Sequence, residues 1–203
     1  GGEPRRIRLA TSMMLSLPGT PVMRYGDEIG MGEDLSLPGR EPVRTAMQWD
    51  DAPHGGFTYA DRSECPVVAS GPYGPAHVNV AEQRRDPESL LNWTERLIRL
   101  RMETPEIGYG DFSIVDGPDD VLALLYCWRG AEVLIIHNFS DRTREVTFGK
   151  DATGGRARTL VDLLDGDHDA ADDEGRHTIV LEPCGYRWYR VGGFGEALKR
   201  REA

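Results

Sequence analysis

The chain has 203 residues, of which 39% are apolar and 29% are charged, and its formal net charge at pH 7 is −10. This composition is typical of a globular protein with one large domain or two small ones. The negative charge disfavours binding to nucleic acids and to anionic membranes. No apolar run approaches the roughly 20 residues that span a bilayer. We therefore expect neither a nucleic acid nor a membrane as a partner.

The cysteines and the start of the sequence bear on where the protein works. Cys65, Cys127 and Cys184 are an odd number and show no C-x-x-C spacing, which favours a reducing cytoplasm over a disulfide framework or a zinc site. Cys127 lies within an apolar run, so we expect it in the core. The sequence begins Gly-Gly-Glu-Pro, with neither an initiator Met nor a signal-peptide pattern. We expect the chain to be part of a longer protein.

The first part of the chain alternates between helix and strand patterns. Residues 5–16 place apolar side chains at helical spacing, and Pro18-Gly19 ends that helix. The short run 21–25 predicts a strand, and a helix, a break and a strand in succession are typical of α/β folds. Residues 26–86 are rich in Gly, Pro, Asp and Ser. Loops of this length are usually functional, so we expect this one to line a site.

A second helix is predicted after this loop. Asp86 is a typical N-cap residue, and Pro87 fits the first helical position. An apolar stripe continues through residues 90–102, and Thr104-Pro105 ends the helix.

The last part of the chain has the pattern of an all-β domain. Six strand-length apolar runs, separated by turn residues, predict a small antiparallel β-sandwich: residues 121–128, 132–139, 143–148, 157–164, 176–181 and 186–191. The sequence therefore predicts an α/β segment over residues 1–106, a β-sandwich over 107–192 and a polar tail over 193–203.

Two motifs carry a resemblance to a known family. SLPGTPVMRYGDEIGMG (16–32), followed by GREPVRTAMQWDDAPHGGF (39–57), resembles the end of the catalytic barrel in the α-amylase family, glycoside hydrolase family thirteen. Within the family the chain looks most like the trehalose synthases and α-glucosidases. The sandwich end, PCGYRWYRV, is similar to the last strand of their C-terminal domain. The resemblance covers residues 5 to 192.

The resemblance implies the C-terminal end of a (β/α)₈ barrel followed by the sandwich. The last barrel strand would lie near 21–25 and the last helix near 87–102. Residues 26–86 would form the loop after the eighth strand, at the end of the barrel where active sites lie. The family's catalytic Asp, Glu and Asp lie upstream of the first motif, so none can be assigned to this chain. We therefore expect the chain alone to be inactive and to need the N-terminal part of the barrel as its partner.

Arg40 and Arg44 match the two arginines of the second motif, and the resemblance implies that they bind an α-glucoside substrate. A guanidinium suits this role because its fixed donors can hold two sugar hydroxyls or orient a carboxylate. The alternative is an internal salt bridge to Asp27, Glu28 or Glu33.

Four further residues are candidates for supporting the site. Asp27 and Glu28 follow the expected strand, but adjacent carboxylates point in different directions, so hydrogen bonds to backbone or arginine are the alternative to direct chemistry. Gln48 and Trp49 complete the M-Q-W part of the second motif. Trp49 either stacks on a sugar ring or packs the loop onto the barrel.

No motif indicates a cofactor or a metal. The acidic run that starts at Asp165 lacks the Gly and Glu positions of an EF-hand loop, and we interpret it as a solvated turn between strands. No phosphate-binding loop, dinucleotide fingerprint or metal-ligand histidine spacing occurs. We expect no cofactor and no metal.

Three functions remain open. The first is the C-terminal part of an enzyme that acts on α-glucosides with retention, by hydrolysis, by transfer or by interconversion of maltose and trehalose. The second is a structural or glucan-binding β-sandwich module without chemistry of its own. The third is the remnant of a truncated gene.

Overall fold

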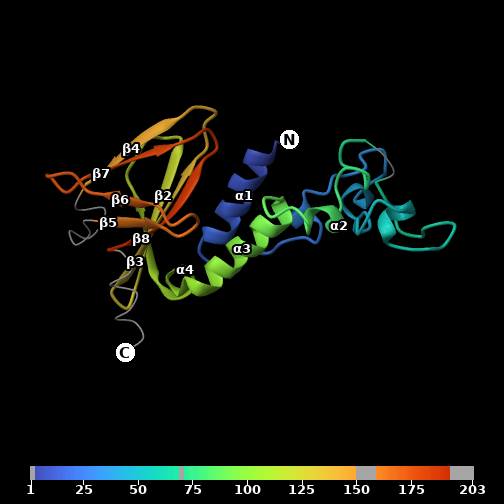
Figure 1. Cartoon of the computed structure of the whole chain (residues 1–203), viewed down its shortest axis with the longest axis horizontal. Coiled ribbons are helices and arrows are strands. Elements are labelled where there is room, and N and C mark those ends of the chain that lie inside the picture. The colour runs from blue at the N-terminus through green and yellow to red at the C-terminus, as the bar shows by residue number, and fades with distance from the viewer. Residues whose placement is uncertain (1–2, 69–70, 150–158, 193–203) are drawn as a thin grey trace. The chain divides into compact units, whose positions relative to one another are not determined.

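The computed structural model describes residues 3–68, 71–149 and 159–192 (Figure 1). Contacts divide the chain into two compact units. The sheet unit contains Glu3–Pro21 and the chain from Leu97 onward, and the loop unit contains Val22–Arg96. The predicted boundary near residue 106 follows the family's barrel rather than these contacts, and it stays a prediction. The predicted tail, residues 193–203, lies outside the described residues.

Helix α1, Pro4–Ser16, confirms the first predicted helix. Pro4 occupies the first helical turn, where its missing N–H costs no hydrogen bond. The buried residues recur at helical spacing along one face, at Leu9, Ser12, Leu15 and Ser16. The helix ends at Leu17, which is extended because Pro18 follows it.

The predicted strand at 21–25 is wrong. Residues 21–24 have no regular structure, and Tyr25 begins a turn. A strand needs a neighbour to take its backbone hydrogen bonds, and none of the strands in the described ranges pairs with this segment. Its polar groups are used locally instead: the Arg24 N–H donates to Asp27 Oδ2 (3.0 Å), and Arg24 Nη1 donates to the Val43 carbonyl (2.6 Å).

The second predicted helix begins later than expected. Helix α3 is Leu90–Glu103, and Ser89 Oγ accepts the N–H of Asn92 (3.2 Å) at its start. Asp86 instead accepts the N–H of Glu88 (2.9 Å) in the preceding turn. Two short helices flank α3, namely α2 (Val80–Gln83) and α4 (Pro105–Tyr109). Nowhere in the described ranges is a helix both long enough and apolar enough to cross a bilayer.

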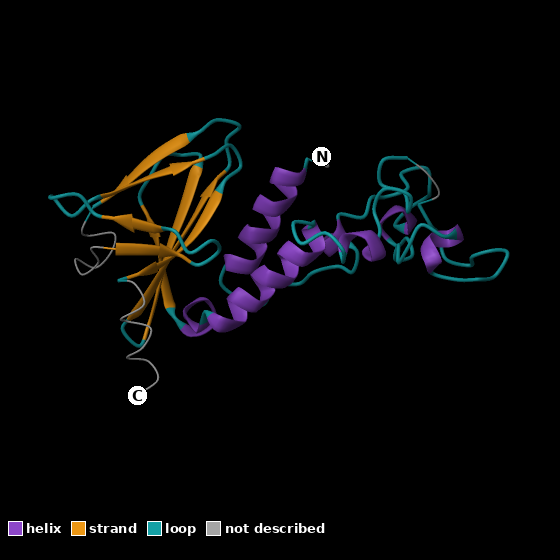
Figure 2. Ribbon diagram, in the orientation of Figure 1, coloured by secondary structure: helices purple, strands orange, loops and turns teal. Residues whose placement is uncertain are grey.

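The described strands all belong to the sheet unit and pair antiparallel (Figure 2). One sheet has the order β1-β2-β3-β8-β5-β6, and the other pairs β4 with β7. The bounds are β1 Asp111–Val115, β2 Val121–Trp128, β3 Ala131–Asn138, β4 Arg144–Phe148, β5 Thr159–Asp162, β6 His168–Ala170, β7 His177–Leu181 and β8 Tyr186–Val191. Each of the six predicted runs contains a strand. The arrangement as a sandwich behind a barrel end stays a prediction.

One apolar cluster joins the two sheets. It contains Leu134 and Tyr189 from the larger sheet and Phe148 and Ile179 from the smaller one, all buried. Cys127 is exposed, so the expectation that it lies in the core is wrong. Alternate residues of β2 contact this cluster only as far as Leu125, and Cys127, two residues further along, lies beyond it.

Two polar attachments hold the helices of the sheet unit. Arg190 Nη1 on β8 donates to Glu106 Oε1 on α4 at 2.6 Å, and both side chains are buried. On α3, the Arg101 guanidinium donates to the carbonyls of Leu15, in the last turn of α1, and Gly19, which follows the helix. Burial raises the pKa of Asp162 on β5 to about 6, although Arg187 lies 3.6 Å away.

Candidate functional site

All six candidate residues from the sequence belong to the loop unit. Short turns and an apolar cluster order this segment. The buried members of the cluster come from distant parts of the loop and are Ile29, Met31, Met47 and Val80. Gln83 Nε2 adds a bond to the Ile29 carbonyl (2.8 Å). The loop is therefore a packed structure that can present side chains in fixed directions.

Asp27 and Glu28 lie in a short 3₁₀ helix, Asp27–Ile29, that follows Gly26. Gly26 has a φ of 99°, a left-handed conformation that favours glycine. Asp27 accepts the Arg24 N–H, and Glu28 Oε2 accepts the Gly26 N–H (2.6 Å). Both carboxylates therefore hold the turn, and any role next to a substrate remains a proposal.

Arg40 and Arg44 flank a second 3₁₀ helix, Glu41–Val43. The partners expected for an internal salt bridge do not pair with Arg44, whose Nη1 lies 3.8 Å from Glu41 Oε1. The Arg44 side chain is 59% exposed, so this pair is weak. Arg40 is also exposed, and it has no hydrogen bond or ion pair to any other residue in the described part of the chain. Both guanidinium groups are thus available to a ligand.

Gln48 fixes the centre of the second motif. Its side chain is buried, and Nε2 donates to the carbonyls of Tyr73 (3.0 Å) and Val78 (2.5 Å). The backbone carbonyl of Gln48 accepts the N–H of Val80 (3.0 Å). Gln48 therefore joins three points of the loop, and its Oε1 is buried without a hydrogen bond to any residue that the structure describes.

Trp49 is presented from this fixed point. Its N–H donates to the Gly55 carbonyl (2.7 Å), and its carbonyl accepts the N–H of Ala81 (2.9 Å). Its side chain is 46% exposed in this chain. Gly56, in the turn that follows, has a φ of 67°, and a Cβ there would lie 2.4 Å from Asp50 Oδ1. The left-handed backbone therefore favours glycine at this position.

We expect Gln48→Met to loosen the loop unit while keeping the side-chain volume. Two buried carbonyls would lose their donor, which typically costs about 1–3 kcal/mol, so proteolytic cleavage between residues 50 and 78 should become roughly tenfold faster. Limited proteolysis read by mass spectrometry measures this rate. Tyr59→Phe is the control, because Tyr59 is 96% exposed, and it should leave the rate unchanged. Equal cleavage rates in Gln48→Met and the unmodified chain would show that the hydrogen bonds of the Gln48 side chain do not hold the loop.

Arg24 and Phe57 lie within the two motifs but were not among the six candidate residues from the sequence. Arg24 joins the two motifs, because its guanidinium donates to the carbonyl of Val43, the residue before Arg44. Phe57 ends the second motif and is 42% exposed, on the turn that is bonded to Trp49. A signal for Arg24 was its position inside the first motif. Its partner, however, could not be read from spacing.

The acidic run that starts at Asp165 spans the turn before β6, strand β6 itself and the turn between β6 and β7. Asp172 Oδ1 accepts the N–H groups of Glu174 (2.9 Å) and Arg176 (2.8 Å), and these bonds lower the pKa of Asp172. Similarly, bonds from Ser36 lower the pKa of Asp34 in the loop unit. Among the residues whose positions are given, no three His, Cys, Asp or Glu side chains gather as metal ligands would.

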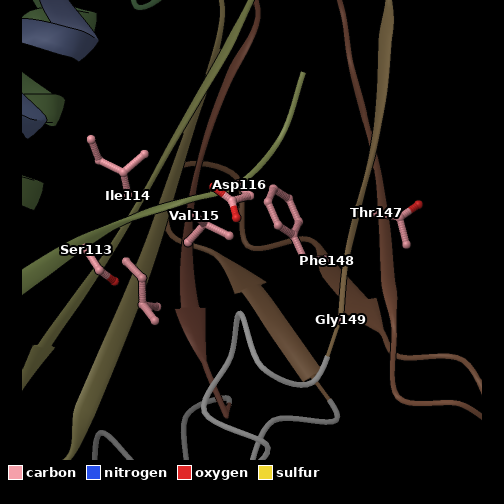
Figure 3. A pocket seen from close by; sticks show the side chains of 8 residues that line it. Ser113, Ile114, Val115, Asp116, Thr147, Phe148 and Gly149 are labelled. Carbon is pink, nitrogen blue, oxygen red and sulfur yellow. The ribbon is translucent and has the colours of Figure 1, made fainter. Parts of the chain in front are cut away.

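The sheet unit has a hollow of about 370 Å³ where β1 and β4 approach each other (Figure 3). It is lined by Ser113, Ile114, Val115, Asp116, Leu125, Thr147, Phe148 and Gly149. Val115, Leu125 and Phe148 belong to or pack against the cluster between the sheets, so the hollow is an opening in that core. It contains none of the six candidate residues.

Comparisons with known proteins match both parts of the chain. The family described as "Alpha amylase, catalytic domain" matches residues 3–110, and "Sucrose hydrolase-like, C-terminal domain" matches residues 130–190. The trehalose synthase of Thermus thermophilus is 37% identical over 94% of this chain and 20% of its own length. That of Pimelobacter sp. (strain R48) is 34% identical over 93% of this chain and 34% of its own length.

A solved structure shows the same fold. The α-amylase from H.orenii superposes with a TM-score of 0.70 and 23% identity over 93% of this chain and 36% of that one. The chain thus spans between a fifth and about a third of the length of these relatives.

Proposed function

Because the chain belongs to the α-amylase family of glycoside hydrolases, we propose that it forms the C-terminal part of an enzyme that acts on α-glucosides. The reaction is the interconversion of maltose and trehalose, or the hydrolysis of an α-glucoside. The observation that carries this proposal is the 37% identity to a trehalose synthase over 94% of the chain. Because the chain covers 20% of the length of that relative, we propose that the activity belongs to a longer protein.

The positions of Asp27 and Glu28 favour a structural role over a catalytic one. A retaining mechanism needs a nucleophile and an acid/base about 5 Å apart across the scissile bond. Asp27 and Glu28 are neighbours in one turn, and each accepts a backbone N–H. We propose that the catalytic Asp, Glu and Asp come from a preceding part of the barrel, and that the 203-residue chain is inactive by itself.

The arginines supply the contribution of this chain to the site. Arg40 and Arg44 lie at the two ends of one turn, and among the described residues neither has a strong internal partner. Their guanidinium groups bind the hydroxyls of the α-glucoside, while Asp27, Glu28 and Gln48 hold the loop in place. Trp49 offers an exposed aromatic face that suits stacking on a sugar ring or packing against the rest of the barrel.

We propose the domain arrangement, the compartment and the lack of a cofactor from the resemblance to the family. Residues 1–106 form the end of the (β/α)₈ barrel, and residues 107–192 form the β-sandwich behind it. The protein works in the cytoplasm without a cofactor or a metal.

The test compares two proteins: the natural product isolated from its source cells, whose intact mass is measured, and the purified 203-residue chain. Each is incubated with maltose and with trehalose, and the sugars are separated and quantified. We expect a natural product heavier than 22.6 kDa that interconverts the two sugars or releases glucose, and no turnover by the short chain.

Two other outcomes would change the conclusion. Turnover by the short chain would mean that its own carboxylates are catalytic. A natural product that leaves both sugars unchanged, or one of 22.6 kDa, would favour the non-catalytic module or the gene remnant.

A further inference from the structure

Helix α1 is attached to the larger sheet through a buried polar cluster. The cluster consists of two side chains of α1, Ser12 and Ser16, and three of the sheet, Tyr126 on β2, His137 on β3 and Trp188 on β8. All five residues are 0% exposed. Five polar residues without any access to water are stable only if their hydrogen bonds are satisfied within the protein.

The hydrogen bonds of this cluster run between the sheet and the helix. Trp188 Nε1 donates to Ser12 Oγ at 2.9 Å, and Tyr126 Oη donates to the Ser16 carbonyl at 2.6 Å. His137 Nε2 lies 3.1 Å from Ser12 Oγ and 3.4 Å from Ser16 Oγ. His137 therefore lies at the centre of the contact, between both serines.

The other ring nitrogen of His137 has no hydrogen-bond partner in the described ranges. Nδ1 is buried and makes no hydrogen bond to the described residues. A neutral imidazole needs one donor and one acceptor position, whereas an imidazolium presents two N–H donors and a charge. In this site the second N–H would find no acceptor, and the charge would be shielded from water. Protonation and docking of α1 are therefore opposed.

The surroundings of His137 do not compensate a positive charge. The polar groups that contact it from α1 are serine hydroxyls, and the Phe139 ring stacks beside it with centroids 6.3 Å apart. Across the ladder its neighbours are Leu122 and Tyr186. Burial lowers the pKa of His137 to about 4, and a hydrogen bond between the ring and the backbone of Ser12 opposes this shift.

The ionisable groups in and next to the cluster, Tyr126 and Arg101, also provide no negative charge for a protonated His137. Burial raises the pKa of Tyr126 to about 12, so this hydroxyl stays neutral. Arg101, which bonds the end of α1, carries a positive charge that interacts with Tyr126. The described structure thus gives His137 no nearby carboxylate as a counter-ion, in contrast to His177, whose Nδ1 lies 2.5 Å from Asp169 Oδ2.

We propose that His137 is an acid-sensitive latch: protonation of its ring releases helix α1 from the sheet while the strands stay paired.

Proton linkage determines how the stability of α1 docking changes with pH. The docked state holds His137 with a pKa of about 4, and the released state exposes it with the ordinary pKa of 6.5. Docking is therefore fully stabilised above pH 6.5 and weakens as the pH falls towards 4. At pH 5 the helix should open about 30-fold more often than at pH 8.

The experiment is amide hydrogen exchange of the 203-residue chain at pH 8 and pH 5, corrected for the intrinsic pH dependence of exchange. The protection factors of α1 should fall about 30-fold, while those of β3 and β8 stay constant. His137→Gln keeps an amide near Ser12 but cannot titrate, so its α1 protection should not depend on pH. His168→Gln is the control, because His168 is an exposed histidine of β6, and it should respond like the unmodified chain.

Three results would overturn the latch: unchanged α1 protection at pH 5, a full response in His137→Gln, or equal loss of protection in β3 and β8. A titration of the unmodified chain by NMR covers the case in which His137→Gln does not fold. In that titration the indole N–H of Trp188, which donates to Ser12 on α1, must exchange faster as the pH falls, with the same pH dependence as the amides of α1. A different dependence would contradict the proposal.

Discussion

Replacing Glu106 with alanine is expected to lower the free energy of unfolding of the chain by about 3–5 kcal/mol. Glu106 and Arg190 are both buried, and Nη1 and Oε1 are 2.6 Å apart. Without the carboxylate, the Arg190 charge on β8 would be left in the interior without its counter-ion. Urea unfolding followed by circular dichroism measures the difference, provided that the m-value is unchanged.

The matched control for this prediction is an exposed ion pair. Arg6 Nη2 and Asp141 Oδ1 are 2.7 Å apart, with side chains 56% and 72% exposed. Asp141→Asn should leave the unfolding midpoint unchanged, because water solvates both partners. A double replacement, Glu106→Leu with Arg190→Met, should recover most of the lost stability, since it removes both charges. A Glu106→Ala midpoint equal to that of Asp141→Asn would contradict the argument.

Trp188→Ala should lower the free energy of unfolding by a similar amount, about 3–5 kcal/mol. Trp188 is among the largest side chains with no exposure to solvent, and it lies on the central strand β8, between β3 and β5. Its removal leaves a cavity beneath α1 and takes away the donor of Ser12 Oγ. Thermal and urea unfolding both report the loss.

Two variants separate the causes of this loss. Trp188→Phe keeps much of the volume and removes the hydrogen bond, which is worth about 1 kcal/mol. Val180→Ala removes apolar volume from a side chain that is 53% exposed on β7, and it should change stability little. If Trp188→Phe were as damaging as Trp188→Ala, the hydrogen bond rather than the cavity would dominate.

The sequence predicted local elements well where the pattern and its boundaries are local. The runs 121–128 and 186–191 became β2 and β8 with the same bounds, since turn residues flank them and apolar residues fill them. The strand at 21–25 failed because a strand depends on a partner that no short-range pattern reveals. β1 was missed for a related reason: as the edge strand of its sheet it is mostly exposed, so its pattern is weak.

The candidate site was predictable as a region but not as a set of contacts. The two motifs located the loop unit and its arginines, whereas the partner of Arg44 proved to be Glu41. The expected partners were Asp27, Glu28 or Glu33. The Gln48 side chain bonds the carbonyl of Val78, 30 positions away, a separation over which spacing alone indicates nothing. Cys127 shows the same limit, because its exposure depends on where the cluster between the sheets ends.

The loop unit is an insertion between two parts of the sheet unit, which the chain leaves after Pro21 and enters again at Leu97. Arg101, soon after the point of return, bonds the Gly19 carbonyl just before the point of departure, at 2.8 Å. A segment whose ends are held together in this way can change length at little entropic cost, since doubling a closed loop adds only about 0.6 kcal/mol. The loop unit can therefore gain or lose residues without refolding the strands of the sheet unit.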